Sequence, residues 1–386
     1  MRRYPKHGRP ALALVLALAS AACSDGAGMR SQATDPRATV LSDSAFATLS
    51  QQLSGPGGYF DTDNLISNET SYLHVIATLE ELGVEGGAYI GVGPDQNFSY
   101  IAAVRPLIAF IIDIRRDNLL LHLMFKAMFE LSENRIEYLC LLFGRPIPEN
   151  PESWDGHRIH ELVAYIDETE ATPELAETSL ALVASEVQRL GLPLDEGDVK
   201  RIRRFHSTFI DAGLDLRFQS YGRRPRPRYP TYRQLLLETD LMGRQSNYLA
   251  SEEAFRFVKS LQERNRVIPV VGDLGGRHAL RAIGEEIEGR GLVVSAFYTS
   301  NVEFYLVQDR TFHTYALNVR SLPRDEESVI IRAYFGRNFG FVHPQAVAGY
   351  YSVQLLQPLS EFVHDFEAGN YENYLDIVMS DEIEVH

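Results

Sequence analysis

The sequence predicts an α/β fold built on a mostly parallel β-sheet. Two short apolar runs without polar alternation, residues 88–90 and 107–112, indicate strands that are buried on both faces, as in a parallel sheet. Helical patterns follow these runs, and the alternation of strands and helices returns after residue 250. With 386 residues, of which 45% are hydrophobic and 23% charged, the chain is long enough to bury a full apolar core.

The N-terminus has the pattern of an export signal. Four basic residues precede an apolar run at residues 11–18 and a stretch of small residues that ends at Ala22. An apolar run of this length is typical of a secretory signal peptide and is too short to span a membrane. We therefore interpret residues 1–22 as a signal peptide and residues 23–43, which are mostly small and polar, as a flexible tether.

Cys23 directly follows the small residues. The segment Ser20-Ala21-Ala22-Cys23 resembles the lipobox of bacterial lipoproteins, although that family usually has leucine at the position of Ser20. The resemblance implies that the Cys23 thiol is acylated after cleavage and that the protein is anchored in the bacterial cell envelope, on the periplasmic face. The alternative is ordinary cleavage near residues 19–22, which would leave Cys23 as a free thiol.

The charge of the chain excludes one class of partner. Without residues 1–22 the chain keeps 33 Lys and Arg residues against 52 Asp and Glu residues, a formal charge of −19. Nucleic-acid binding needs a basic surface that displaces counterions, so we expect no nucleic-acid partner. Attraction to anionic lipids is disfavoured for the same reason. We therefore expect membrane contact only through the lipid anchor.

Residues 44–144 are expected to form the first half of the core. The two strands described above alternate there with helices expected at 44–53, 69–82, 118–131 and 133–143, the second of them capped by Ser67 or Asn68. Cys140 lies in the last of these apolar helices and is expected to be a buried packing residue, not a nucleophile.

Residues 145–232 interrupt this pattern and are interpreted as a helical insertion or cap. Two amphipathic helices are expected in it, at 172–190 and 196–212. The basic, proline-rich segment 222–230 closes the region. An extended surface loop against an acidic face is one interpretation of this segment, and contact with a phosphate or an acidic partner is the other.

Residues 233–345 are expected to form the second half of the core. Helices are expected at 252–265, 279–288 and 300–306, and buried strands at 267–271 and 292–297. Residues 311–319 and 328–335 alternate more and predict antiparallel strands at a sheet edge. Residues 346–386 are expected to form a C-terminal helix and an acidic tail.

The candidate site residues follow the predicted strands, because a parallel sheet binds ligands beyond the carboxyl ends of its strands. They are Gly91, Gly93, Asp95, Asn97, Asp113, Arg115, Asn118, Asp273, Gly275, Thr299, Ser300, Asn301 and Glu303. Glycines at 91 and 93 allow a tight turn and close approach of a ligand to the backbone. Asp113 stands twenty residues after Gly93, where a carboxylate can hydrogen-bond the hydroxyls of a ribose.

This part of the chain resembles class I S-adenosylmethionine-dependent methyltransferases, which have a Rossmann-type sheet. The segment 91–93 (Gly-Val-Gly) matches their glycine loop, Asp113 matches their ribose-binding acid, and residues 271–274 (Val-Gly-Asp-Leu) stand where their fourth-strand motif is expected. Two departures are Tyr89, where an acidic residue is common, and Asp95, where a small residue is common. The stretch 89–118 also resembles an uncharacterised bacterial family with such a core and no established activity.

The resemblance covers residues 60–143 and 250–340 and implies S-adenosylmethionine as the cofactor. The residues that it implies for cofactor binding are Gly91, Gly93, Asp95, Asn97 and Asp113. If the protein is an enzyme, we expect Asp273 and Asn301 to face the reacting end, because both follow apolar strands.

Because S-adenosylmethionine is made in the cytosol, export disfavours methyl transfer. Three functions therefore stay open. They are the binding of a small, nucleoside-type ligand or an envelope partner, methyl transfer, and another enzymatic activity such as hydrolysis.

Other arrangements are open for some of these residues. Asp95, Asp113 and Asp273 are candidates to converge on a hard cation. His157 and His160 lack a third ligand nearby, and we expect no metal site. The segment 299–301 is suited either to polarise a substrate or, with Glu303, to cap the following helix.

Overall fold

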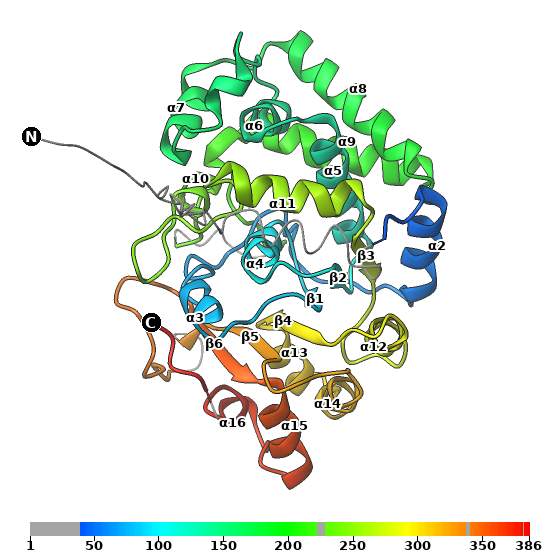
Figure 1. Cartoon of the computed structure of the whole chain (residues 1–386), viewed down its shortest axis with the longest axis vertical. Coiled ribbons are helices and arrows are strands. Elements are labelled where there is room, and N and C mark those ends of the chain that lie inside the picture. The colour runs from blue at the N-terminus through cyan, green and yellow to red at the C-terminus, as the bar shows by residue number, and fades with distance from the viewer. Residues whose placement is uncertain (1–38, 222–227, 337–339, 381) are drawn as a thin grey trace, which may run out of the picture. The chain divides into compact units, whose positions relative to one another are not determined.

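The computed structural model describes residues 39–221, 228–336, 340–380 and 382–386 (Figure 1). The predicted signal peptide, Cys23 and most of the predicted tether lie outside these residues, as do residues 222–227 of the basic loop. Within the part of the chain that the structure describes, no helix is long and apolar enough to cross a membrane.

A six-stranded, mostly parallel sheet forms the centre of the described chain, which confirms the predicted α/β class. The strands are β1 (Ala88–Gly91), β2 (Ile108–Asp113), β3 (Val267–Val271), β4 (Val294–Ser300), β5 (Val329–Tyr334) and β6 (Val353–Pro358). Their order is β3-β2-β1-β4-β5-β6, and only β6 runs antiparallel to its neighbour. The chain order of the strands reverses between β1 and β4, so the loops after these two strands diverge.

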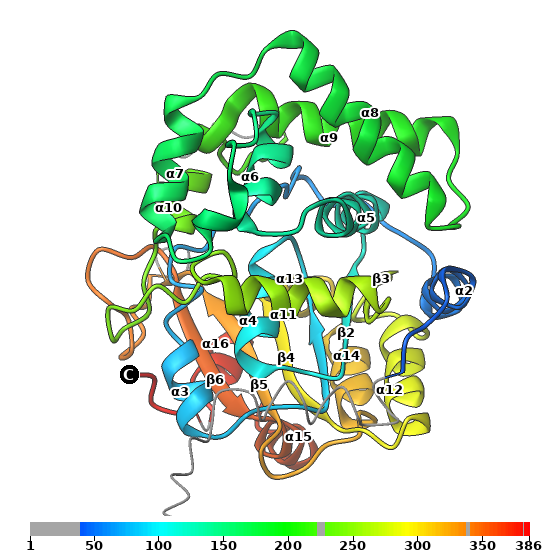
Figure 2. The same cartoon turned by 45° about the horizontal axis from the view of Figure 1, so that its top comes forward.

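Helices cover both faces of this sheet (Figure 2). One face carries α4 (Gln96–Val104), α5 (Arg116–Leu131) and α11 (Glu252–Glu263), and the other carries α12 (Ala279–Gly289), α13 (Val302–Gln308), α14 (Phe312–Arg320) and α15 (Leu359–Ala368). The remaining helices of the core are α2 (Asp43–Leu53) beside β3, α3 (Ile76–Glu81) beside α4, and α16 (Tyr374–Val378) beside α13. The strands are therefore buried on both sides, which explains their unbroken apolar runs.

The region between α5 and α11 forms a second helical layer (Figure 1). It contains α6 (Arg135–Phe143), α7 (Ile159–Glu168), α8 (Pro173–Arg189), α9 (Glu196–Ala212) and α10 (Tyr232–Leu236). Thr172 caps α8 and Pro173 begins it, so the helix starts where its sequence predicts. Helices α8 and α9 pack against α5 and against each other.

Three predictions of secondary structure are wrong. Only residues 76–81 of the predicted helix 69–82 are helical, because Ser71 and Tyr72 turn inward and hydrogen-bond Ser352 and the carbonyl of Leu235. Residues 311–319 form α14, not a strand. The antiparallel partner of β5 is instead β6, which lies in the segment 346–386. The helix predicted in this segment is present as α15, but the strand before it was not expected.

The last described residues cover the outer edge of β6. The amide of Ile383 donates to the carbonyl of Leu356 at 2.8 Å, and Gln345 binds the backbone of Ile383 and Val385. The amide of His386 donates to Thr78 on α3 at 3.2 Å. These contacts occupy an edge that would otherwise be free to pair with another strand.

Candidate functional site

A cavity of about 260 Å³ lies at the carboxyl ends of β1, β2, β3 and β4. Its walls come from the loops after these strands and from α13. Residues 59–69 and Phe218, Ser220 and Tyr229, which lie between α9 and α10, complete the lining. This is the place that the parallel sheet predicts for a ligand.

Six of the predicted site residues line this cavity together: Gly93, Asp113, Arg115, Asp273, Ser300 and Asn301. Asp273, however, follows β3, which is the third strand and lies beside β2, so residues 271–274 do not occupy the position of a fourth-strand motif. The fourth strand ends at Ser300, and Ser300 also lines the cavity.

Gly91 and Asn97 organise the loop after β1 and are not among the residues that line the cavity. The amide of Asn97 donates to the carbonyls of Val92, Gly93 and Pro94, and its Oδ1 accepts the Tyr89 hydroxyl at 2.8 Å. A Cβ on Gly91 would lie 1.9 Å from this Oδ1. Glycine at 91 is therefore required by the Asn97 side chain, and Tyr89, the first departure from the methyltransferase pattern, holds that side chain in place.

Gly93 presents the loop to the cavity. Its φ of +84° lies in the left-handed region, which glycine adopts without strain. The Gly93 carbonyl accepts the Nε2–H of His122 on α5 at 2.8 Å, and burial lowers the pKa of His122 to about 4. The neutral imidazole thus fixes the turn, and the predicted role of Gly93 at the ligand agrees with its position.

Asp95 points away from the cavity, contrary to the interpretation of this residue as a ligand-binding group. Its Oδ2 accepts the hydroxyl of Tyr232 at 2.5 Å and that of Tyr248 at 3.3 Å. Burial raises the pKa of Asp95 to about 6, although both tyrosine hydroxyls lower it. Asp95 therefore ties the glycine loop to α10.

Asp95→Asn is expected to stabilise the protein at pH 8 by roughly 1–3 kcal/mol. The carboxyl of Asp95 binds its proton more tightly in the folded chain than in the unfolded chain, where its pKa is near 3.8. Its contribution therefore weakens the fold as the pH rises from about 4 through 6, and the amide removes this dependence. Urea unfolding at pH 5 and pH 8 measures the effect, and the exposed Asp211→Asn is the control. Equal pH dependence of Asp95→Asn and the wild-type protein would contradict the argument.

Asp113 forms an ion pair with Arg115 at the cavity wall. Arg115 donates from Nε to Oδ1 at 3.1 Å and from its second guanidinium nitrogen to Oδ2 at 2.9 Å, and its amide donates to Oδ1 at 2.9 Å. The other terminal guanidinium nitrogen of Arg115 donates hydrogen bonds to the backbone carbonyls of Thr62 and Asp63. Oδ2 of Asp113 thus accepts only one of these bonds and keeps acceptor capacity for a ligand hydroxyl.

Glu69 is a cavity residue that the sequence does not reveal. Its carboxylate is 1% exposed and accepts hydrogen bonds from the Ser300 hydroxyl, from Tyr298 at 2.8 Å and from Gln354 at 2.5 Å. Burial raises the pKa of Glu69, and the three donors oppose this effect. Glu69 lies in a segment that the sequence predicts to be helical, and Gln354 lies in the predicted C-terminal segment. No pattern in the sequence therefore indicates the hydrogen bond between them.

Three buried polar atoms of cavity residues, Gln96 Oε1, Thr62 Oγ1 and Ser220 Oγ, lack a hydrogen-bond partner among the described residues. Gln96 and Thr62 are both 6% exposed. Buried polar atoms in native proteins are nearly always paired, so these three atoms are available to a polar ligand in the cavity.

The described residues hold no cluster of three or more His, Cys, Asp or Glu side chains suited to a metal ion. In particular, Asp95, Asp113 and Asp273 do not converge, because Asp95 faces tyrosines and Asp113 faces Arg115. Cys140 is fully buried, and burial raises the pKa of its thiol to about 12, which confirms it as a packing residue.

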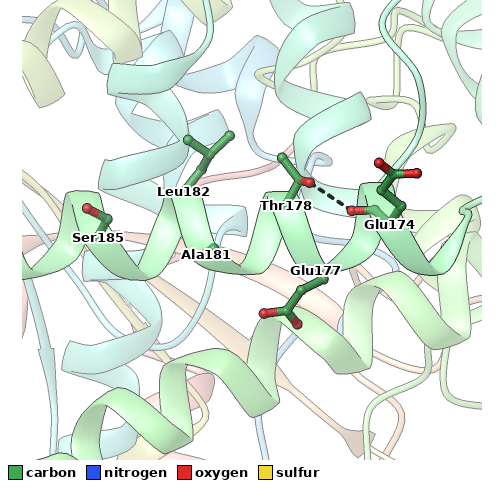
Figure 3. A pocket seen from close by; sticks show the side chains of 6 residues that line it. All are labelled: Glu174, Glu177, Thr178, Ala181, Leu182 and Ser185. Carbon is green, nitrogen blue, oxygen red and sulfur yellow. Dashed lines mark hydrogen bonds between the residues drawn. The ribbon is translucent and has the colours of Figure 1, made fainter.

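A second hollow lies on α8 and has no convergent groups (Figure 3). All six lining residues belong to this one helix. Thr178 bonds the carbonyl of Glu174 at 2.8 Å, and Glu177 points toward the neighbouring helix, where it pairs with Arg203 of α9. This hollow is a depression on the surface of one helix.

Comparison with known proteins gives a family and no function. A search of curated proteins found no match. A family model described as a domain of unknown function, DUF7790, matches residues 65–145 and 215–383, which is more than half of the chain. The model does not match residues 146–214, which contain α7, α8 and α9. The matched residues include all six strands and most of the residues that line the cavity. The chain belongs to the DUF7790 family.

Proposed function

We propose that the cavity binds a small polar ligand of nucleoside type. The observation that carries the proposal is the set of three buried, unpartnered atoms, Gln96 Oε1, Thr62 Oγ1 and Ser220 Oγ, at a cavity beside the reversal of the strand order. All three atoms accept hydrogen bonds, and the Thr62 and Ser220 hydroxyls also donate, so they suit a ligand with hydroxyl or amino groups.

Other features of the cavity support the same class of ligand. Asp113 Oδ2 is suited to accept a ribose hydroxyl, as the spacing from Gly93 predicts. Phe60 and Tyr305 line the cavity with ring centroids 4.9 Å apart and offer flat apolar surface to a base.

Methyl transfer is the second candidate, and the sheet favours it. The strand order β3-β2-β1-β4-β5-β6 supports a Rossmann-type arrangement, and the antiparallel pair β5 and β6 at the edge supports a likeness to the last two strands of the methyltransferases that this chain resembles. Gly93 and Asp113 would hold S-adenosylmethionine, with Gln96 beside them, and Asp273 and Asn301 would face the reacting end. When bound, this cofactor supplies an electrophilic methyl group.

Calorimetric titration of the full chain with adenosine, S-adenosylmethionine and S-adenosylhomocysteine tests the proposal. We expect saturable binding of at least one of them, weakened about tenfold by Gln96→Leu or Thr62→Val, since a lost hydrogen bond contributes about 1.4 kcal/mol. Gln188→Leu, on the exposed side of α8, is the matched control. The absence of binding at millimolar ligand would overturn the proposal. Binding of the two S-adenosyl compounds without adenosine would favour methyl transfer.

We further propose that the protein acts in the bacterial envelope, held by a lipid on Cys23. The support is the sequence of the export signal and its lipobox-like end. Cys23→Ser should move the protein from the membrane fraction to the soluble fraction, and unchanged fractionation would contradict the anchor. If the partner is an envelope protein instead of a small molecule, its capture should survive Asp113→Ala.

A further inference from the structure

Ser300 sits at a sharp turn between a strand and a helix. It is the last residue of β4, and α13 begins at Val302. Its φ is +52°, a region that a residue with a Cβ rarely adopts. The other non-glycine residues with positive φ in the described chain have ordinary reasons for it. Asn64 and Asn265 are of the type that tolerates it, while Arg105 and Arg310 lie at helix ends.

The strained backbone brings the Ser300 hydroxyl to the cavity and to a carboxylate. Ser300 is partly exposed and lines the cavity, and its Oγ donates to Glu69 Oε1. Glu69 is buried behind it, and Tyr298 and Gln354 both donate to Oε2. A hydroxyl bonded to a base that other groups hold in place is the general arrangement of an activated nucleophile.

We propose that Ser300 is a nucleophile for acyl transfer, with Glu69 as its general base. The Ser300 Oγ forms a bond to the carbonyl carbon of an ester, and its proton passes to Glu69. The bond from that carbon to the leaving alkoxide breaks, and the alkoxide takes the proton from Glu69. Water then releases the acid by the same two steps, so no oxidant or further reactant is required.

The cavity wall beside Ser300 indicates the class of acyl group. Val302, Tyr305 and Leu306 of α13 line it next to this residue, and Leu274 adds further apolar surface. We therefore expect a short apolar acyl chain. This activity would share the cavity of the proposed nucleoside site, but it uses Ser300 and Glu69, whereas that proposal depends on Gln96, Thr62 and Ser220.

A fluorophosphonate probe tests the nucleophile directly on the full chain. Attack forms a bond from Ser300 Oγ to phosphorus, fluoride leaves, and the proton goes to Glu69. We expect peptide mass spectrometry to find the adduct on Ser300, and Ser300→Ala to abolish it. Ser185→Ala, which removes an exposed hydroxyl on α8 away from the cavity, should leave labelling unchanged. Failure to modify Ser300 would overturn the proposal, whether or not nucleosides bind.

The pH profile of labelling tests whether Glu69 is the base, and it does so in the protein with Glu69 unchanged. The labelling rate should rise with pH as Glu69 loses its proton, and Tyr298→Phe should move this rise to higher pH because it removes a donor to the carboxylate. Glu69→Gln should lower the rate at least about 100-fold, the usual contribution of a general base. A rate that is independent of pH between 4 and 8, or a rise that Tyr298→Phe does not move, would exclude Glu69 as the base.

Discussion

Gly91→Ala is expected to destabilise the protein by about 3 kcal/mol, the sum of overpacking and at least one broken hydrogen bond. The added Cβ would lie 1.9 Å from Asn97 Oδ1 and 2.7 Å from the ring of Tyr89. Asn97 cannot yield without losing bonds that hold the loop after β1. Urea unfolding followed by circular dichroism measures the change.

Gly289→Ala is the matched control for this variant. Gly289 is the last residue of α12, and a Cβ there meets no atom within 4 Å, so alanine should be neutral or stabilise by up to about 1 kcal/mol. The double variant Gly91→Ala/Asn97→Ala should lose less stability than the two single variants together. The reason is that Asn97→Ala removes the side chain with which the new Cβ at position 91 clashes. Additive effects would show that Gly91 is not constrained by Asn97.

Glu303→Gln is expected to destabilise the protein by about 3–5 kcal/mol, because it leaves the buried guanidinium of Arg332 without its counter-charge. Both side chains are at most 2% exposed, and they are joined by bonds of 2.7 and 3.2 Å. Tyr315 and Gln357 complete the network. The midpoint of urea unfolding measures the loss of stability. Because the pair is buried, this loss should not depend on the salt concentration.

A comparison with exposed charges makes this test specific. Glu367 pairs with Arg320 at the surface, where both are about half exposed, so Glu367→Gln should change stability by less than about 0.5 kcal/mol. Replacing both Glu303 and Arg332 with methionine should recover much of the stability that the single variant loses. If Glu303→Gln behaves like Glu367→Gln, the buried pair does not hold the edge of the sheet.

The helices and strands that could be predicted from the sequence are those whose secondary structure is determined by their own residues. The strands β1, β2 and β3 follow from apolar runs, and α8 begins at a capping threonine before a proline. The segment 69–75 could not be predicted, since its polar groups bind residues far along the chain, such as Ser352. In α14, Tyr315, Ala316 and Val319 form one buried stripe of a helix, although the wider pattern suggests alternation.

The same distinction applies to the candidate site. Gly93, Asp113, Asp273 and Asn301 could be predicted because each follows a strand end, which places it at the crevice. Asp95 also follows a strand, but its side chain turns toward tyrosines of later segments. Glu69 meets Ser300 across 231 positions, a contact that no local pattern contains. Glu303, expected to support a helix cap, pairs instead with Arg332.

The contacts between the last described residues and α3 have a consequence for folding kinetics. His386 binds Thr78 and Glu81 across 308 and 305 positions, and Ser71 meets Ser352 across 281. Loops of this length must close before such contacts form, and topologies rich in distant contacts fold slowly. The central strand β1 also has β4 as a neighbour, and about 200 residues separate the two in the chain. The sheet can therefore be completed only late in folding, and until then the apolar edges of β1 and β6 are exposed to association with other chains.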